Sequence, residues 1–308
     1  MINNINTKSE IRVIGLQRNG NHAIINWIIQ QSGDNVLFFN DVEPENPLDE
    51  SRLMSRSSNL SASNFDRIIY SYEDRLLNLI THKNYYPQKN IYNITADKRI
   101  DLLILRNPFN SFASRMKHQA VSSQLSTYIS GLSLPQLWIT YANEFLGKTH
   151  QLNNIVTLNY DLWCCSVDYR KQIAKKLDIE FTDKGFKDIT SYGQGSSFDS
   201  TKFDKNASEM ATDQRWKSFA KDQKYTELFF DKLVIKLTRK IFGISKDLDD
   251  YIEQEIIPNT NWKIELKRKL SIKFLPSIVT YARNSSAIRH MYFTFLMPYR
   301  KRKVSKHR

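Results

Sequence analysis

A glycine-containing turn between a short apolar run and an apolar-periodic segment most constrains the fold. Residues 11–33 read IRVIGLQRNGNHAIINWIIQQSG. The run Ile11–Leu16 predicts a strand, and the apolar spacing over Ala23–Ser32 predicts a helix that ends at Gly33. Such a unit gathers backbone N–H groups and the positive end of the helix dipole around the turn. The stretch therefore predicts an α/β unit with an anion site for phosphate or sulfate.

The turn has the glycine spacing of a Walker loop but lacks its functional side chains. Gly15 and Gly20 match G-x-x-x-x-G, whereas Asn21 and His22 occupy the positions of the usual Lys-Ser/Thr pair. Arg18 supplies positive charge inside the turn, and a guanidinium suits the oxygens of phosphate or sulfate. We expect a nucleotide loop that works without a metal, which argues against an ordinary ATPase or kinase. A purely structural βα turn is the alternative.

The second informative stretch is the continuous apolar run Ile100–Arg106, typical of a parallel strand buried on both faces. Asn107 followed by Pro108 is a favourable helix start. Arg106 therefore stands at the carboxyl end of a strand, where ligands bind in open α/β sheets. Ser114 follows it by eight residues along the predicted helix.

The remaining pattern alternates strands and helices. Further strands are expected over Asn35–Phe39, Arg67–Tyr72 and Asn154–Tyr160. Helices are expected over Leu76–Thr81, Pro108–Lys117, Ser133–His150, Tyr169–Leu177, Glu209–Phe219 and Tyr225–Phe242. Loops are expected over Asp41–Asn64 and Thr190–Ser200. This order predicts three αβα layers around a central, mostly parallel sheet, in one nucleotide-binding domain over 1–260.

Two of these stretches, in this order, resemble motifs of the sulfotransferases that use 3′-phosphoadenosine 5′-phosphosulfate, in particular the bacterial P-loop type. GLQRNGNH (15–22) is similar to their 5′-phosphosulfate loop. LRNPFNSFASR (105–115) is similar to their 3′-phosphate motif, with Arg106 and Ser114 as its Arg and Ser. Tyr160 stands where the family has a Tyr near the adenine. YGQGSSFD (192–199), ahead of Arg215, resembles a late loop that closes over the nucleotide.

The resemblance implies a sulfotransferase fold and metal-free, in-line transfer of a sulfuryl group to a hydroxyl or amine, with 3′,5′-ADP leaving. The donor-binding residues it implies are Arg18, Asn19, Gly20, Asn21, His22, Ala23, Arg106, Ser114, Tyr160, Gly195, Ser196 and Ser197. The chain departs from the common pattern with Arg18 in place of a Lys and Asn21-His22 in place of Thr/Ser. Two rival functions are a P-loop kinase or phosphotransferase, which Asn21-His22 contradicts, and a non-catalytic binder of anionic polymers.

Three residues are candidates for the chemistry. Glu73, at the end of the predicted strand in RIIYSYED, is the first choice for the general base, and His22 is the second. Arg18 is placed to stabilise charge that develops on the bridging oxygen. For Glu73, a solvated strand-end carboxylate is the alternative. His118 is expected to be a surface or packing residue.

The positive charge lies almost wholly at the carboxyl end. Of the net charge of +13, residues 261–308 carry +12, interleaved with aromatic and aliphatic side chains. A basic helical extension packed on the core with a solvated end is one interpretation, and contact with an anionic membrane surface is another. We see no signal peptide and no apolar run of about 18 residues, and the adjacent Cys164 and Cys165 suit a reducing compartment. A cytoplasmic enzyme, peripheral at the inner membrane surface and acting on a bacterial carbohydrate or glycolipid in polysaccharide biosynthesis, is the expectation.

Overall fold

The computed structural model describes residues 3–33, 35–44, 46–54, 64–81, 92–118, 132–190, 195–260 and Leu266. Its centre is a five-stranded sheet of order β2-β3-β1-β4-β5, in which every neighbouring pair is parallel. The strands are β1 (Asn3–Gly15), β2 (Val36–Phe39), β3 (Asn64–Glu73), β4 (Tyr92–Leu105) and β5 (Ile155–Asn159). The predicted parallel sheet is confirmed.

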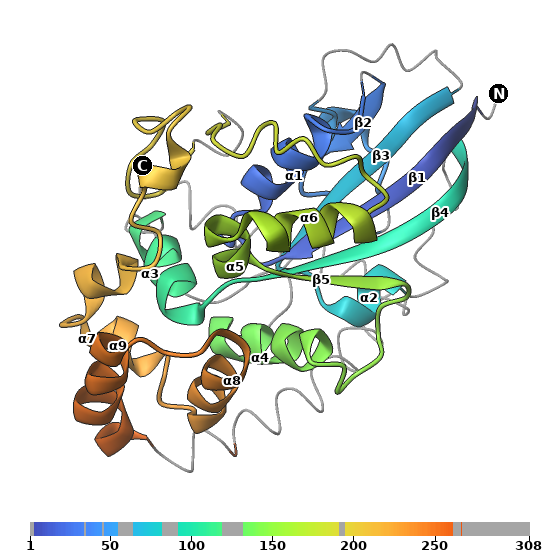
Figure 1. Cartoon of the computed structure of the whole chain (residues 1–308). Coiled ribbons are helices and arrows are strands. Elements are labelled where there is room, and N and C mark those ends of the chain that lie inside the picture. The colour runs from blue at the N-terminus through green and yellow to red at the C-terminus, as the bar shows by residue number, and fades with distance from the viewer. Residues whose placement is uncertain are drawn as a thin grey trace, which may run out of the picture.

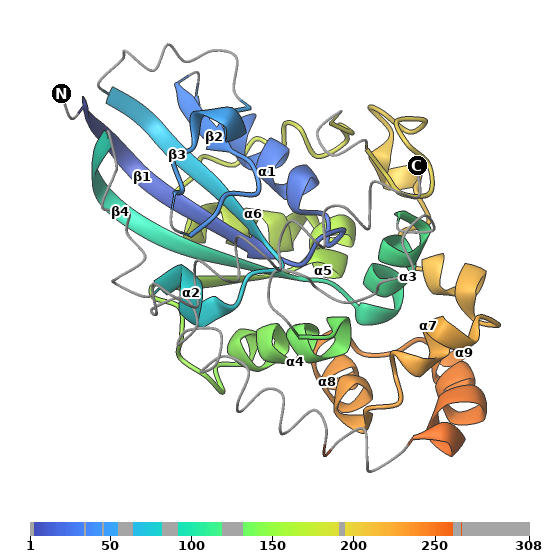
Figure 2. The same cartoon turned by 180° about the vertical axis from the view of Figure 1, so that it is seen from behind.

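Alternation along the strands divides the apolar side chains between two faces of the sheet. On β4, Leu102 and Ile104 join one buried cluster, and Leu103 and Leu105 join the other. Both faces are therefore covered, as an all-parallel sheet requires. This is the expected three-layer αβα arrangement (Figures 1 and 2).

Different helices cover the two faces (Figures 1 and 2). The helices α1 (Asn21–Ile29), α5 (Tyr160–Cys165) and α6 (Val167–Lys176) pack on one face. The other face carries α2 (Leu77–Thr81), α3 (Pro108–His118), α4 (Leu134–Phe145) and α8 (Lys232–Phe242). Short segments complete the described chain: 3-10 turns Glu50–Arg52, Ala207–Glu209, Arg215–Phe219 and Ile257–Asn259, helices α7 (Gln223–Glu227) and α9 (Lys246–Tyr251), and a π-turn Ile252–Ile256.

Two local expectations were wrong, and β1 begins earlier than the predicted strand Ile11–Leu16. Residues 3–10, polar in sequence, form its first part, where Arg67 donates to Ser9 Oγ and Arg99 donates to the Glu10 carboxylate. The expected helix Glu209–Phe219 is two 3-10 turns separated by residues 210–214. The expected helix Tyr225–Phe242 is interrupted, since the Asp231 side chain accepts a hydrogen bond from Leu233 N and so starts α8 anew.

The register of the sheet places the carboxyl ends of all five strands at one edge. Gly15 pairs with Glu73, and Leu105 pairs with Asn159. The segments that follow these residues therefore start side by side. Arg106 comes directly after β4 and Tyr160 directly after β5, so the sheet brings the predicted motifs to a common edge.

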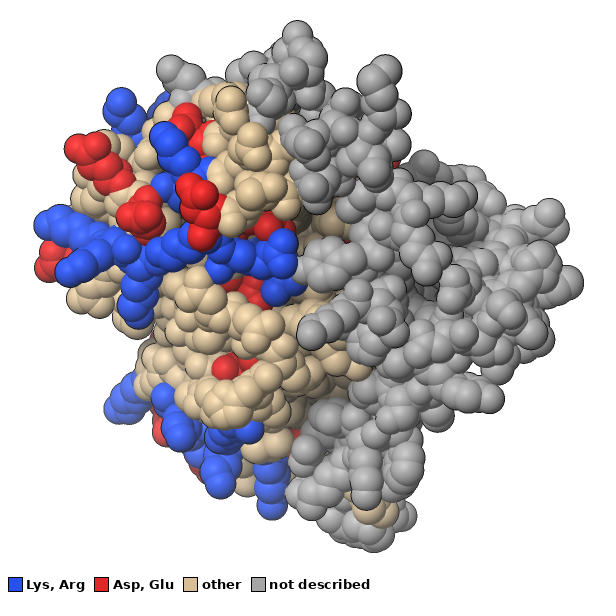
Figure 3. Space-filling model, turned by 90° about the vertical axis from the view of Figure 1, so that its right-hand side faces the viewer, with Lys and Arg blue, Asp and Glu red and all other residues tan. Residues whose placement is uncertain are grey.

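Basic and acidic side chains are interspersed on the described surface at the right of Figure 1 (Figure 3). This agrees with the near-neutral charge of residues 1–260. The basic segment 261–308 and its expected helical structure lie outside the described residues, apart from Leu266. A search of the described helices finds none with the length and apolar character to cross a membrane.

Candidate functional site

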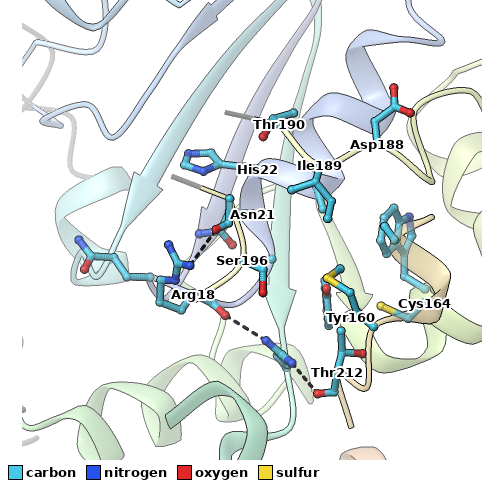
Figure 4. A pocket seen from close by; sticks show the side chains of 18 of the residues that line it. Arg18, Asn21, His22, Tyr160, Cys164, Asp188, Ile189, Thr190, Ser196 and Thr212 are labelled. Carbon is cyan, nitrogen blue, oxygen red and sulfur yellow. Dashed lines mark hydrogen bonds between the residues drawn. The ribbon is translucent and has the colours of Figure 1, made fainter. Parts of the chain in front are cut away.

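A cavity of about 380 Å³ lies at the carboxyl edge of the sheet (Figure 4). Each of the five strands delivers at least one wall residue at its carboxyl end: Arg18 after β1, Asn40 after β2, Glu73 at the end of β3, Arg106 after β4 and Tyr160 after β5. This is where ligands bind in open parallel sheets. The cavity is therefore the candidate active site.

The glycine loop is built so that only glycine fits at two of its positions. Gly20 has φ +90°, and a Cβ there would lie 2.0 Å from the Tyr160 ring. A Cβ on Gly15 would lie 2.3 Å from Asn21 Oδ1. Glycine at 15 thus makes room for the Asn21 side chain, which donates to Leu16 O and to the Glu73 carboxylate at 2.9 Å. The loop, the start of α1 and the end of β3 form one unit.

Three arginines from separate segments meet at the cavity. Arg106, 1% exposed, donates to the carbonyl oxygens of Arg18 and Thr212 and to Ser114 Oγ. Arg215 donates to the same Ser114 Oγ at 2.9 Å. Arg18 donates to Gly195 O at 2.8 Å, which ties the loop after residue 194 to the glycine turn. The cluster concentrates positive charge on one side of the cavity.

This positive charge is only partly compensated. Among the described residues, Arg106 forms no salt bridge, and its buried Nε has no hydrogen-bond partner. Arg215 has a single ion pair, with Asp199 at 3.7 Å. Burial, together with the nearby Arg106 charge, lowers the pKa of Arg215 to about 10. Burial also lowers the pKa of Arg18, with a counteracting effect of Glu73. Because buried charges are costly without partners, the cluster is suited to an anionic ligand.

Glu73 and His22 lie on the same wall of the cavity. Burial raises the pKa of Glu73, while the nearby His22 and the hydrogen bond from Asn21 lower it. His22 Nε2 lies 2.9 Å from Asn40 Oδ1. A partly buried carboxylate with a raised pKa is suited to take a proton near neutral pH.

The sequence-predicted residues divide by where their side chains lie. Arg18, Gly20, Asn21, His22, Ala23, Glu73, Arg106, Tyr160, Gly195 and Ser196 line the cavity. Three predicted residues do not: Asn19, which is fully buried and accepts from Ser111 Oγ; Ser114; and Ser197. Ser114 instead bridges Arg106 and Arg215 beneath the wall. Its position in the motif thus corresponds to support of the arginines.

The sequence did not predict most of the cavity wall around Tyr160. Trp163, Cys164, Phe186, Ile189 and Met210 line it together with Tyr160. Phe186 packs edge-on against Trp163, with ring centroids 5.0 Å apart. Trp163 and Cys164 reach the site because they follow Tyr160 in α5, and packing of the segment after α6 against α5 adds Phe186 and Ile189.

Several polar residues of the cavity were also outside the predicted set, among them Thr212, Arg215 and His118. Thr212, whose carbonyl accepts from Arg106, and Arg215 lie close together in the late segment. The sequence feature that points to Arg215 is its position after the loop 192–199, which was predicted to close over the nucleotide. His118, expected to be a surface or packing residue, is the last residue of α3 and lines the cavity. Within the described ranges, no group of three or more His, Cys, Asp or Glu could hold a metal ion.

Comparisons with known proteins give a likeness in structure. Neither a protein-family model nor a curated protein matches the chain. Among solved structures, the chain is similar to mouse sulfotransferase SULT7A1 complexed with PAP, at 14% sequence identity and a TM-score of 0.41. That match covers 80% of this chain and 89% of the mouse protein.

Proposed function

We propose that the chain is a sulfotransferase that uses 3′-phosphoadenosine 5′-phosphosulfate as donor. The observation that carries the proposal is the convergence of Arg18, Arg106 and Arg215 on one cavity beside a glycine loop. A nucleotide with a phosphate at each end of its ribose needs two cationic sites. Arg18 and the loop N–H groups are suited to the 5′ side, and Arg106 with Arg215 to the 3′-phosphate. The buried Nε of Arg106 without a partner supports an anion there.

The aromatic wall suits the adenine of such a donor. Tyr160 lies under Gly20, and Trp163 and Phe186 add flat apolar surface. Bound there, the donor supplies the sulfuryl group. The chain's own residues would orient that group, exclude water and stabilise negative charge on the bridging oxygen through Arg18 and the start of α1. For the general base we propose Glu73 first and His22 second, since both lie on the wall away from the aromatic residues.

The acceptor proposed is a hydroxyl-rich molecule such as a carbohydrate or the sugar of a glycolipid. The wall formed at the ends of β1, β2 and β3 consists of polar side chains: Gln17, His22, Asn40, Asp41, Arg52 and Glu73. Polar groups that a ligand covers bind a partner that satisfies their hydrogen bonds, and they reject one that leaves them unpaired. Carboxylate and amide oxygens on this wall favour hydroxyl or amine donors over an apolar phenol or steroid.

A thermal-shift series tests the donor. We expect 3′,5′-ADP to stabilise the protein, by about 2.7 kcal/mol at a hundredfold excess over its Kd. 5′-AMP, which lacks the second phosphate, should stabilise it far less, and Mg-ATP should do no better than 5′-AMP. Arg106→Ala and Arg18→Ala should each reduce the bisphosphate effect. A response to Mg-ATP alone would favour the kinase alternative.

For the basic segment 261–308 we propose contact with an anionic membrane surface, which would hold the enzyme beside a membrane-linked glycan. The support is its charge of +12 interleaved with apolar residues. Vesicles containing anionic lipid should bind the full chain and lose binding when 261–308 is deleted. Equal vesicle binding by both proteins would refute the contact without affecting the donor assignment.

A further inference from the structure

Two hydrogen bonds connect His22 through Asn40 to Ser71 near the buried end of β3, and a third holds the Ser71 hydroxyl. The backbone N–H of Asp41 donates to Ser71 Oγ at 2.7 Å. Ser71 Oγ donates to Asn40 Oδ1 at 3.0 Å, and the same Asn40 oxygen lies 2.9 Å from His22 Nε2. Ser71 is 1% exposed, so water does not compete for its hydroxyl. This series of hydrogen bonds runs from the sheet to the wall of the cavity.

Each of these hydrogen bonds has a defined donor and acceptor. Ser71 Oγ donates to Asn40 Oδ1 and also accepts the Asp41 N–H. The Asn40 atom facing His22 is the same Oδ1, a carbonyl oxygen, which can only accept. The contact with His22 then requires a proton on Nε2. Neutral His22 with that proton carries its lone pair on Nδ1.

We propose that Asn40 and Ser71 are positioning residues that hold neutral His22 as its Nε2–H tautomer, so that the ring accepts a proton only through Nδ1. The tautomer itself does not depend on the reaction. Its catalytic consequence rests on the proposed sulfuryl transfer, in which Nδ1 is the atom of His22 able to accept the proton of an acceptor hydroxyl. The hydroxyl oxygen would form its bond to sulfur as that proton moves to Nδ1, and the bond from sulfur to the bridging oxygen of the donor would break.

Several charged or titratable groups line the same cavity as His22 and Asn40. They are Arg18 in the glycine loop, Asp41 and Arg52 in the segment after β2, Glu73 at the end of β3, and His118 at the end of α3. None of them takes the place of the Asn40 oxygen at Nε2, since 2.9 Å is a full hydrogen-bond distance. The substitutions that test the proposal therefore change Asn40 and Ser71 and leave these charges in place.

Nitrogen-15 NMR of the full-length chain with labelled histidines tests the tautomer directly, with no substrate. Among the six histidines, His22 is assigned as the signal lost in His22→Gln. In its neutral form, wild-type His22 should carry its proton on Nε2 alone. Asn40→Leu should give a mixture of the two tautomers, and Ser71→Ala should give the same mixture with a smaller share of the Nδ1–H form. Asn40→Asp keeps an acceptor oxygen at this position, so it should keep the tautomer.

The exposed His150 is the internal control, because its signals should be the same in every folded variant. A wild-type proton on Nδ1, or an unchanged tautomer ratio in a folded Asn40→Leu, would overturn the proposal. With donor and a sugar acceptor, Asn40→Leu should lower kcat tenfold or more and leave KM for the donor unchanged. The expected tautomer without any sulfuryl transfer would support the positioning and refute the proposed function.

Discussion

Replacing Arg215 with Met should separate ligand binding from stability. In the ligand-free protein the charge of Arg215 is buried near Arg106, and burial lowers its pKa from the ordinary arginine value to about 10. At 1.36 kcal/mol for each pH unit, the folded state disfavours this charge by about 3 kcal/mol. Met removes that cost. It also removes the hydrogen bonds to Ser114 and Ser196, each about 1 kcal/mol, and the contact with the Phe198 ring, about 0.5–1 kcal/mol. The 3.7 Å ion pair with Asp199 is lost too, at a cost of up to about 1 kcal/mol.

These opposing contributions nearly cancel. The free energy of unfolding of ligand-free Arg215→Met, measured by urea denaturation, should therefore lie within about 1 kcal/mol of wild type. The affinity for 3′,5′-ADP should fall much more. Loss of one hydrogen bond to a charged group costs about 1.5–3 kcal/mol, which is roughly 10- to 150-fold in Kd.

Arg12→Met is the matched control. Arg12 is as buried as Arg215, but it forms a two-bond ion pair with Asp101, whose side chain is 0% exposed. Removing this arginine leaves a buried carboxylate without its partner, which should cost about 3–5 kcal/mol of stability. If Arg215→Met lost as much stability as Arg12→Met, or bound 3′,5′-ADP as tightly as wild type, the argument for an anion-binding cluster would be refuted.

Three further predictions concern the walls of the cavity. Gly20→Ala should abolish stabilisation by 3′,5′-ADP in thermal shift, because the added methyl would overlap the Tyr160 ring; normal binding would contradict the loop geometry. Glu73→Gln should lower kcat about 100-fold or more if Glu73 is the base. Since burial raises the pKa of Glu73, wild-type activity should be lost as pH falls through a value above the ordinary carboxyl range, and an identical acid limb in Glu73→Gln would exclude this role. Iodoacetamide should alkylate exposed Cys165 before Cys164, whose pKa burial raises to about 11, as peptide mapping would reveal.

Local chemistry explains why part of the site was predictable. Gly15 and Gly20 are adjacent to a strand and a helix start in sequence, so the loop conformation follows from a few neighbouring residues. Arg106 follows a continuous apolar run that can only be a buried strand, and the carboxyl ends of parallel strands share one edge. The helix start at Asn107 was predictable because a capping residue acts on its immediate neighbours. The Asn107 side chain accepts a hydrogen bond from Phe109 N.

Other features depended on contacts between distant segments. The helix expected over Glu209–Phe219 was wrong because an apolar pattern does not reveal that Thr212 O is held by Arg106, 106 residues earlier. The same holds for Phe186, whose ring packs against Trp163 and under Arg170. Side chains whose position depends on such distant contacts have no identifying pattern among the residues next to them in the sequence.

The amino-acid sequence alone determined the α/β class, the parallel sheet and the edge at which a ligand would bind, because apolar periodicity and glycine geometry act over a few residues. Only the tertiary structure decided which side chains share the cavity. It brought Arg215 to Ser114 across 101 residues, so that the Ser114 hydroxyl accepts hydrogen bonds from both Arg106 and Arg215. It also connected His22 to Ser71 through Asn40. Such contacts arise from sheet register and loop packing, which no local pattern specifies.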